Sequence, residues 1–595
     1  MLMILMKVRI LLADTTGVDL PILDELAQKG VVNAVFTLIM TSVLRIIYKG
    51  YDALGSVLIA LSVRNTKEKV PIPPIGDRKL LLQSASDIAD MIRNRKVTSE
   101  EVVRMFIGRI QEVNTHVNGL VDERFEIAID EARKVDRMIQ SGEFDEMELK
   151  DKFPLLGVPF TIKDSFCVAG LRHTAGLYYR KDIIAPQDSD AVKMLKRVGA
   201  IPLGVTNVPE LCMWWESVNT VYGRSRNPYD TRHITGGSSG GEAAVQGAAG
   251  SAFGIGSDIA GSIRMPSFFC GIFGHKPTTG LISNWGQQPE VKGRLAEFLT
   301  TGPMVRHAKD LRLIFDVLIG ENVQKMNKIP EKNQLRILFM EDDGGSPLAS
   351  PVDPEMKDAL RKAIQHLEKT YGVKAQKANI SKLYNSLEIW AQAMSGAGAV
   401  PFCEELALKQ GKINPFWEVV KFCFRMSPHT FPAIILGIIE KIAYAGNQLP
   451  RHKQMIELGF TLAKEIQEVL KDDAILLYPS FPSPAPRHYV PFFRPADFSY
   501  CAIFNVLGVP VSQVPLGLGS KGLPLGVQIV GGMHSDHITI SIAEELERAF
   551  GGWVQPTPQQ TKPSAPQLKK LESTPEKPTT TPTPTPPVTT PPQAS

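Results

Sequence analysis

Two glycine- and serine-rich loops in the middle of the chain constrain its fold more than any other feature. The first loop, Gly236–Gly241, reads GGSSGG, and the second, Gly256–Pro266, carries Asp258, Ser262 and Arg264. Alanine and glycine fill most of the segment between the two loops. Glycine adopts backbone conformations that other residues avoid, and it lets a ligand approach backbone N–H groups closely. A tightly packed helix between the loops would therefore bring serine hydroxyls and backbone amides together.

Four interpretations of these loops compete. A phosphate-binding loop lacks support, because neither a GxxxxGK[ST] pattern nor a GxGxxG frame is present. A nucleophile elbow fits the GxSxG pattern at Ser238 and again at Ser239, but it requires His and Asp partners and leaves the second loop unexplained. A pair of purely structural turns leaves Lys163, at the end of an apolar run, without a role. The fourth interpretation, a hydrolase that uses two serines and this lysine, depends on a resemblance to a known family.

The segment Gly236–Pro277 resembles the signature of the amidase signature family. The resemblance implies that Lys163 is the catalytic base, that Ser262 is the nucleophile, and that Ser238 bridges them and follows a cis peptide bond. It extends over about residues 84–553 and is most specific around the two loops. Further matching phrases are Thr206-Asn207, Pro209-Glu210, Asn227-Pro228 and Lys276-Pro277-Thr278. Other phrases, such as Glu210–Trp214 and Gly271–Pro277, resemble the branch of the family that acts on fatty-acid amides.

The resemblance also assigns supporting roles. Backbone N–H groups of the second loop would form the oxyanion hole, and further residues would contact the substrate or brace the loops. The expected oxyanion donors are Ile259, Ala260, Gly261 and Ser262; the expected substrate contacts are Cys212, Met213 and Ser238; the expected loop supports are Ser239, Asp258 and Arg264. This chemistry requires no metal and no cofactor, so we expect none.

The role of Lys163 places a demand on its surroundings. A lysine with the ordinary pKa of about 10.4 is almost fully charged at neutral pH and cannot act as a base. Burial would lower the pKa, and the apolar run that ends at Lys163 favours burial. Asp164 would oppose this shift, but neighbouring residues of a strand point to opposite faces of a sheet. We therefore expect Asp164 to point away from the lysine.

One position departs from the family pattern. The family usually has glycine where this chain has Ala260. Alanine still supplies a backbone N–H, but an alanine forced to positive φ would strain the loop by about 1 kcal/mol or more. The sequence therefore raises the hypothesis that the protein is a catalytically impaired scaffold, although the intact Lys163, Ser238 and Ser262 argue against it.

The middle of the chain, residues 80–553, predicts an α/β fold in which helices flank a mixed central sheet. Thr98–Glu101 is typical of a capping box that opens an amphipathic helix, and apolar residues between Phe125 and Ile139 repeat at helical spacing. Asp190–Arg197 predicts another helix. The predicted buried strands are Leu155–Ile162, Ile201–Val205, Ile337–Met340, Ile475–Tyr478 and Gly526–Val530.

The two ends differ from the middle in composition. Residues 1–75 contain the apolar runs Val31–Leu44 and Ala53–Val63, with Tyr, Lys and Arg between them. Neither run has the 18 or so uncharged residues of a clear spanning helix, so a single-pass helix and a helical hairpin on the protein surface both remain possible. Residues 556–595 are rich in proline and threonine, which predicts a disordered tail.

Composition limits the partners. The net charge of +4 over 595 residues gives no basis for binding nucleic acid. The six cysteines are scattered without a disulfide framework or zinc spacing. We expect a fatty-acid amide substrate, contact with membrane lipid at an intracellular membrane, and leave a homodimer open. The alternatives are an amidase for small soluble amides and the amidase subunit of a transamidating complex. Phe416–Phe424 and Phe431–Ile442 are apolar enough to form an acyl channel, a membrane-facing cap or ordinary core.

Overall fold

A computed structural model describes residues 69–398, 400–444 and 450–556. The apolar runs predicted before residue 69 and nearly all of the predicted disordered tail lie outside these described residues. Among the helices that are described, none combines the length and the apolar character needed to cross a membrane.

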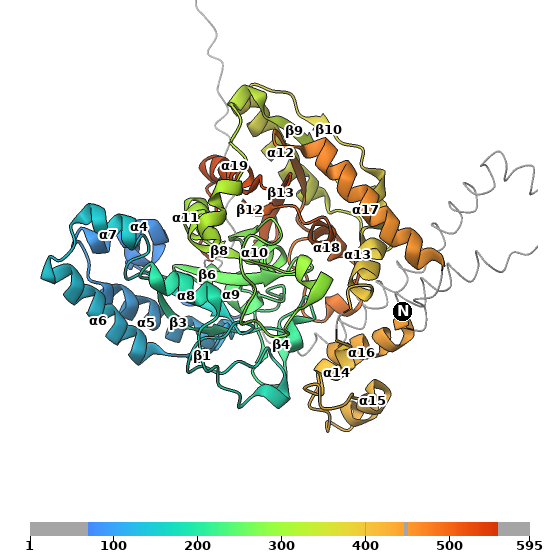
Figure 1. Ribbon diagram of the computed structural model, residues 1–595, viewed down its shortest axis with the longest axis horizontal. Helices are drawn as coiled ribbons and strands as arrows, with labels where there is room; N and C mark the ends of the chain where they lie inside the picture. The colour runs from blue at the N-terminus through green and yellow to red at the C-terminus, as the bar shows by residue number, and fades with distance from the viewer. Residues whose placement is uncertain (1–68, 399, 445–449, 557–595) are drawn as a thin grey trace, which may run out of the picture. The chain divides into compact units, whose positions relative to one another are not determined.

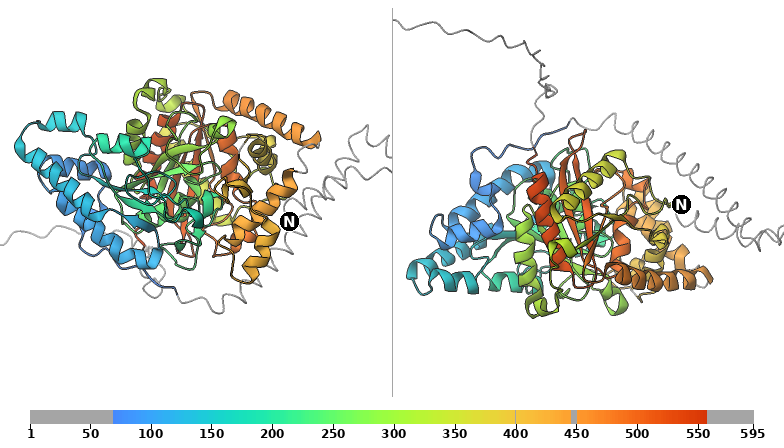
Figure 2. Two further views of the ribbon diagram at one scale, coloured as in Figure 1. Left: turned by 60° about the horizontal axis from the view of Figure 1, so that its bottom comes forward. Right: turned by 90° about the horizontal axis from the view of Figure 1, so that it is seen from above.

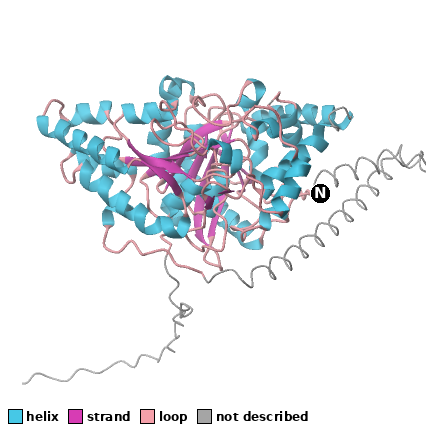
Figure 3. Ribbon diagram, turned by 90° about the horizontal axis from the view of Figure 1, so that it is seen from below, coloured by secondary structure: helices cyan, strands magenta, loops and turns pink. Residues whose placement is uncertain are grey.

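The described residues form an 11-stranded sheet at the centre of the fold, with helices on both sides of it (Figure 3). Its strand order is β1-β3-β2-β6-β8-β7-β12-β13-β11-β9-β10, with parallel and antiparallel neighbours, as the predicted mixed sheet requires. The strands of this sheet are β1 Leu120–Glu123, β2 Pro159–Lys163, β3 Ile201–Thr206, β6 Phe253–Asp258, β7 Phe273–Lys276, β8 Thr300–Val305, β9 Arg336–Phe339, β10 Gln376–Lys377, β11 Ala474–Pro479, β12 Val511–Leu518 and β13 Pro524–Gly531. A separate hairpin pairs β4 Val218–Asn219 with β5 Gly223–Arg224.

The helices fall into groups along the chain, which Figures 1 and 2 show from three directions. The first group is α4 Ala85–Arg93, α5 Ser99–Val117, α6 Phe125–Ser141, α7 Glu146–Lys152 and α8 Asp190–Arg197. The central helices are α9 Gly240–Gly247, α10 Arg264–Phe269, α11 Ala308–Ile319 and α12 Pro354–Tyr371. The last group is α13 Ser386–Ser395, α14 Phe402–Glu405, α15 Pro415–Cys423, α16 Phe431–Tyr444, α17 Pro450–Leu470, α18 Ser499–Val506 and α19 Asp536–Phe550.

Local sequence signals account for several of these boundaries. The capping box at Thr98 is confirmed: its side chain accepts the N–H of Glu101, and the Glu101 carboxylate accepts the N–H of Thr98. Helix α8 has the predicted bounds, and helix α6 contains the predicted repeat. The strand predicted from Leu155 starts four residues later, at Pro159, because the chain makes a turn in which Gly157 has a φ of +72°.

The folded body begins earlier than the predicted boundary at residue 80. Ile72 and Ile75 are both buried. Ile72 packs against Val113, Val117, Ala244 and Ala248, and Ile75 joins the main hydrophobic core. The proline-rich segment around residue 73 is therefore packed as part of the folded body.

Three adjacent parallel strands, β3, β2 and β6, determine where a site can form. Strand β2 pairs in parallel with β3 on one side and with β6 on the other. Because parallel strands end at the same edge of a sheet, Lys163, Thr206 and Asp258 lie at one edge. The chain continues from this edge into the loops that carry Cys212 and Ser262. Ligands in α/β proteins bind at this kind of edge, beyond the carboxyl ends of the strands.

Candidate active site

Lys163 is the last residue of β2 and is buried, with 1% of its surface exposed. Its Nζ lies 2.7 Å from Ser238 Oγ, 2.9 Å from Ser257 Oγ and 3.2 Å from the Ser257 carbonyl oxygen. All three contacts are uncharged oxygens. Nζ can therefore accept a proton from a hydroxyl when neutral or donate to these oxygens when charged.

Burial lowers the pKa of Lys163, while the nearby Cys212 and Asp258 act in the opposite direction. Asp164 takes the opposite face of the strand, as predicted: its carboxyl accepts the N–H and the hydroxyl of Thr174. Burial raises the pKa of Asp164 to about 7, against the effect of the hydrogen bonds from Thr174. The desolvated surroundings of Lys163 thus favour its neutral amine, the form that can accept a proton.

The first glycine loop lies directly beside this lysine. The peptide bond between Gly237 and Ser238 is cis, as the resemblance implies. Ser239 then precedes α9, every residue of which is buried, so the predicted tight packing of the small-residue helix is confirmed. The N–H of Ser239 donates to the carbonyl of Ser262 at 3.2 Å, and this bond joins the two loops.

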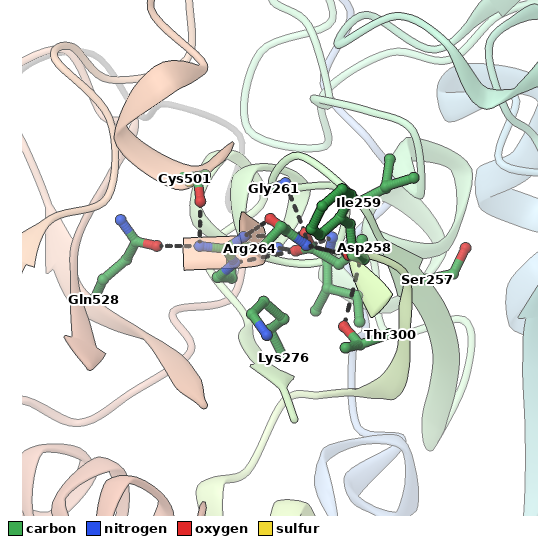
Figure 4. A network of polar contacts seen from close by, with 12 residues as sticks. Ser257, Asp258, Ile259, Gly261, Arg264, Lys276, Thr300, Cys501 and Gln528 are labelled. Carbon is green, nitrogen blue, oxygen red and sulfur yellow. Dashed lines mark hydrogen bonds and ion pairs between the residues drawn. The ribbon is translucent and has the colours of Figure 1, made fainter. Parts of the chain in front are cut away.

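Asp258 and Arg264 brace the second loop from below, and both side chains are fully buried (Figure 4). Arg264 Nη2 lies 3.0 Å from Asp258 Oδ1, and its Nε lies 3.1 Å from Oδ2. Burial alone would raise the pKa of Asp258, but the Arg264 guanidinium holds it well below the usual range. The pair is therefore a charged, interior brace and not a surface ion pair.

The same brace changes the set of oxyanion donors. The N–H of Gly261 donates to Asp258 Oδ1 at 2.7 Å, so the prediction that this N–H faces the substrate is wrong for this structure. Asp258 also accepts the N–H of Ile263 at 3.0 Å. Within the described part of the chain, the N–H groups of Ile259, Ala260 and Ser262 have no protein acceptor, which leaves these three for a developing oxyanion.

The concern about Ala260 does not hold in this structure. Ala260 is absent from the described non-glycine residues with positive φ. The residue that needs positive φ is the next one, Gly261, with a φ of +108°. A side chain at Gly261 would also overlap the Cβ of Cys501. Glycine is therefore required at residue 261, whereas alanine is accommodated at residue 260.

Two of the predicted substrate contacts, Cys212 and Met213, come from a separate loop that follows β3. Leu211 and Cys212 both have positive φ, of 50° and 58°, and Cys212 lies close to Lys163 and to Ser238. Burial raises the pKa of the Cys212 thiol. Met213 packs against an apolar cluster that includes Leu406 and Ala433, from the region of α14 and α16.

Sequence reasoning missed three residues of this site. Ser257 contacts the lysine through two atoms, although it stands within the quoted second loop. Asn505 donates to Asp258 Oδ1 and to two backbone carbonyls, and accepts from Arg264 at 2.7 Å. Gln528 accepts from Arg264 at 2.9 Å. The last two come from α18 and β13, far along the chain, where no local pattern marks them.

Comparisons with known proteins show what the chain as a whole is similar to. The family model described as Amidase matches residues 101–540. Fatty-acid amide hydrolase 2 from Homo sapiens is 44% identical over 511 residues, covering 84% of this chain and 95% of the relative. One of the subunits of the glutamyl-tRNA(Gln) amidotransferase from Syntrophus aciditrophicus is 28% identical over 497 residues, covering 78% and 96%. A solved structure of a fatty acid amide hydrolase shares the fold with a TM-score of 0.63 at 18% identity, covering 86% and 95%.

Proposed function

The chain belongs to the amidase family of amide-cleaving hydrolases, and we propose that it cleaves fatty-acid amides through an acyl-enzyme on Ser262. The substrates would be N-acylethanolamines or primary fatty amides, and the products a free fatty acid and an amine. The observation that carries the catalytic part is the 2.7 Å contact between Lys163 Nζ and Ser238 Oγ, in a place where burial lowers the pKa of the lysine.

The proposed reaction has two halves. Ser262 Oγ attacks the amide carbonyl while its proton passes through Ser238 to neutral Lys163. The N–H groups of Ile259, Ala260 and Ser262 receive the negative charge that develops on the carbonyl oxygen. The C–N bond then breaks, and the proton returns along the same path to the leaving amine. A water molecule cleaves the acyl-enzyme by the same relay and releases the fatty acid.

Two observations support a fatty acyl group as the substrate class. Relatives that share more than 40% identity with this chain over most of their length carry the name fatty-acid amide hydrolase 2. In addition, Met213 beside the site belongs to an apolar cluster with Leu406 and Ala433. Such a cluster suits a hydrocarbon chain, because burial of each CH₂ group contributes about 0.8 kcal/mol.

We also propose that the protein contacts an intracellular membrane through an exposed aromatic surface around α15. Phe424 and Met426 are 72% and 71% exposed, and Trp417 is 56% exposed. Soluble proteins rarely expose so many large apolar side chains together, and aromatic residues favour the membrane interface. We call this set the aromatic surface: Phe416, Trp417, Val420, Phe422, Phe424, Met426 and Phe431.

Basic side chains accompany the aromatic surface. Lys412 and Arg425 are exposed, and Lys441 Nζ lies 5.6 Å from the centre of the Phe416 ring. Lysine and arginine near apolar side chains favour binding to anionic lipid headgroups. A membrane contact here would place the cluster around Met213 close to the source of a lipid-soluble amide. The predicted anchoring role of the segment before residue 69 remains a proposal of its own, as does a homodimer.

The catalytic proposal is tested with a fluorophosphonate probe on the full-length protein. The wild-type protein should be labelled at Ser262, and Ser262→Ala should lose both labelling and hydrolysis while its melting temperature stays close to wild type. Labelling that persists in the variant, or that mass spectrometry assigns to Ser238 or Ser239, would instead favour the nucleophile elbow.

The substrate and membrane proposals need separate measurements. A panel of long-chain amides, short amides and glutamine should show the highest kcat/KM for the long-chain amides; preference for glutamine would favour a role in a transamidating complex. Residues 69–595 should retain activity on a soluble short ester, since every proposed catalytic residue lies within them. Vesicle flotation of this shortened protein and of the full chain would separate anchoring by the first 68 residues from binding by the aromatic surface.

A further inference from the structure

One buried carboxyl group directly beneath the site has no part in the proposed reaction. Glu242 lies in the first turn of α9, four residues after Ser238, and is fully buried. Burying a polar group without hydrogen bonds is costly, so a retained interior glutamate points to a specific set of contacts. Those contacts lie on the strand that carries the catalytic lysine and on its neighbour.

Glu242 joins β2, the strand that carries the lysine, to the neighbouring strand β3. Thr161 Oγ1 donates to Glu242 Oε1 at 2.5 Å, and Thr206 Oγ1 donates to Oε2 at 3.0 Å. Thr161 is two residues before Lys163 in β2, so both side chains leave the same face of the strand. Thr206 of β3 is the residue that pairs with Lys163 in the sheet. The carboxyl group therefore holds the strand of the lysine and its paired position together.

The third strand leaves room for this carboxyl group. Gly254 of β6 pairs with Thr161, and a Cβ at Gly254 would overlap the carboxyl group of Glu242. Any larger residue at this position would displace the glutamate. Residues of all three strands that end at the site, β2, β3 and β6, therefore surround the Glu242 side chain of α9.

The surroundings of Glu242 favour its uncharged form. Among the described residues, no lysine, arginine or histidine forms an ion pair with it, and burial raises its pKa to about 7. Gln246 Nε2 lies 3.1 Å from Glu242 Oε1, while Gln246 Oε1 has no partner in the described part of the chain. With the amide turned so that its oxygen faces Glu242, Gln246 accepts a hydrogen bond from the protonated carboxyl group.

We propose that Glu242 is a positioning residue for Lys163: in its uncharged form it fastens β2, β3 and α9 beneath the lysine without adding a negative charge beside it. This inference rests on the proposed function, because it assumes that Lys163 is the base. A negative charge here would stabilise the ammonium form of the lysine and reduce the neutral fraction that can take a proton. Small displacements of a catalytic group slow the chemical step, so loss of the Glu242 contacts should lower kcat.

The test compares two variants of Glu242 with a matched control. Glu242→Gln keeps an uncharged side chain of the same shape, and Glu242→Ala removes the contacts. Asp310 provides the control, because it is equally buried and accepts hydrogen bonds from Ala85 and Ser86, far from the site. Asp310→Asn and Asp310→Ala thus perturb the interior in the same way without touching β2. Each protein is measured for melting temperature, fluorophosphonate labelling, and kcat and KM on a soluble ester at several pH values.

We expect Glu242→Gln to keep kcat within about threefold of wild type and Glu242→Ala to lose about tenfold or more, with little change in KM. The Asp310 variants should lower the melting temperature but leave kcat unchanged. The acid limb of the rate profile should stay in place in Glu242→Gln. If Glu242→Ala does not fold, Thr161→Val takes its place, since it removes one of the two strand contacts, and a smaller loss of kcat is expected.

Several results would overturn the inference. Full kcat in a folded Glu242→Ala protein, or in Thr161→Val if the alanine variant does not fold, would show that the contacts do not position the lysine. An acid limb that moves to lower pH in Glu242→Gln would show that the glutamate is ionised in the working protein, because removing a negative charge lowers the pKa of Lys163. Equal losses of kcat in the Asp310→Ala variant would indicate a general effect on folding. A wild-type protein that the probe does not label refutes the proposed function itself.

Discussion

Replacing Gly261 by alanine should impair the site, although alanine is already present one residue earlier, at Ala260. Gly261 has a φ of +108°, a conformation that L-residues rarely adopt, whereas Ala260 has no positive φ. An added Cβ at residue 261 would overlap the Cβ of Cys501 and lie 3.2 Å from its Sγ and 3.1 Å from Met265 Cε. The backbone must therefore move, and the N–H that Gly261 donates to Asp258 must move with it.

The magnitude follows from two separate costs. Positive φ in a residue with a Cβ costs roughly 1–2 kcal/mol, and overpacking a well-packed interior typically costs about 1–3 kcal/mol. The sum, about 2–5 kcal/mol, acts on the loop that carries Ser262 and the oxyanion donors. Since each 1.36 kcal/mol in a barrier is about a tenfold change in rate, even one third of this cost at the transition state, about 0.7–1.7 kcal/mol, lowers kcat roughly threefold to seventeenfold.

The assay measures fluorophosphonate labelling, kcat/KM on a soluble ester, and melting temperature for Gly261→Ala. The matched control is Ala260→Gly, which should leave all three close to wild type because residue 260 has no positive φ to relieve. Wild-type labelling and stability in Gly261→Ala would refute the argument from backbone conformation. A large gain of activity in Ala260→Gly would show instead that alanine at residue 260 strains the loop.

Three further predictions follow from the same structure. Lys163→Met should lose most activity. In the wild-type protein, activity should fall as the pH drops through the lowered pKa of Lys163. A rate–pH profile on the soluble ester that shows the same acid limb in the variant would contradict this. Arg264→Met should destabilise the protein by about 3–5 kcal/mol, because it leaves Asp258 charged and unpaired in the interior, and denaturant unfolding would measure the loss. The difference in stability between the wild-type protein and Arg264→Met should shrink at acid pH. Asp258 has a lowered pKa in the folded wild-type protein, so the stability that it contributes is present above its unfolded pKa and is lost as the pH falls through the folded pKa. The double variant Trp417→Ser and Phe424→Ser should reduce binding to anionic vesicles without changing kcat on the ester, and unchanged flotation would exclude the aromatic surface as the membrane contact.

The sequence alone was sufficient wherever the relevant signal is local. The capping box at Thr98, the bounds of α8 and the buried strand that ends at Lys163 depend on neighbouring residues, and the structure confirms them. The two glycine loops are also local signals, since a run of glycine and serine predicts close backbone approach. The sequence could therefore indicate the family and the two loops that the structure places beside Lys163.

Other features depend on contacts between distant segments, and only the tertiary structure decided them. Whether residue 260 or 261 takes positive φ depends on how the loop closes over Asp258, and that closure involves Asn505 from α18. The face exposed by α15 depends on which helices pack beside it, because an apolar helix can be core or surface. Glu242 stands among small residues in α9, and no local pattern marks it. Only the structure shows that β2, β3 and β6 surround its carboxyl group. Hydrogen bonds and close packing depend on distance in space and not on spacing along the chain.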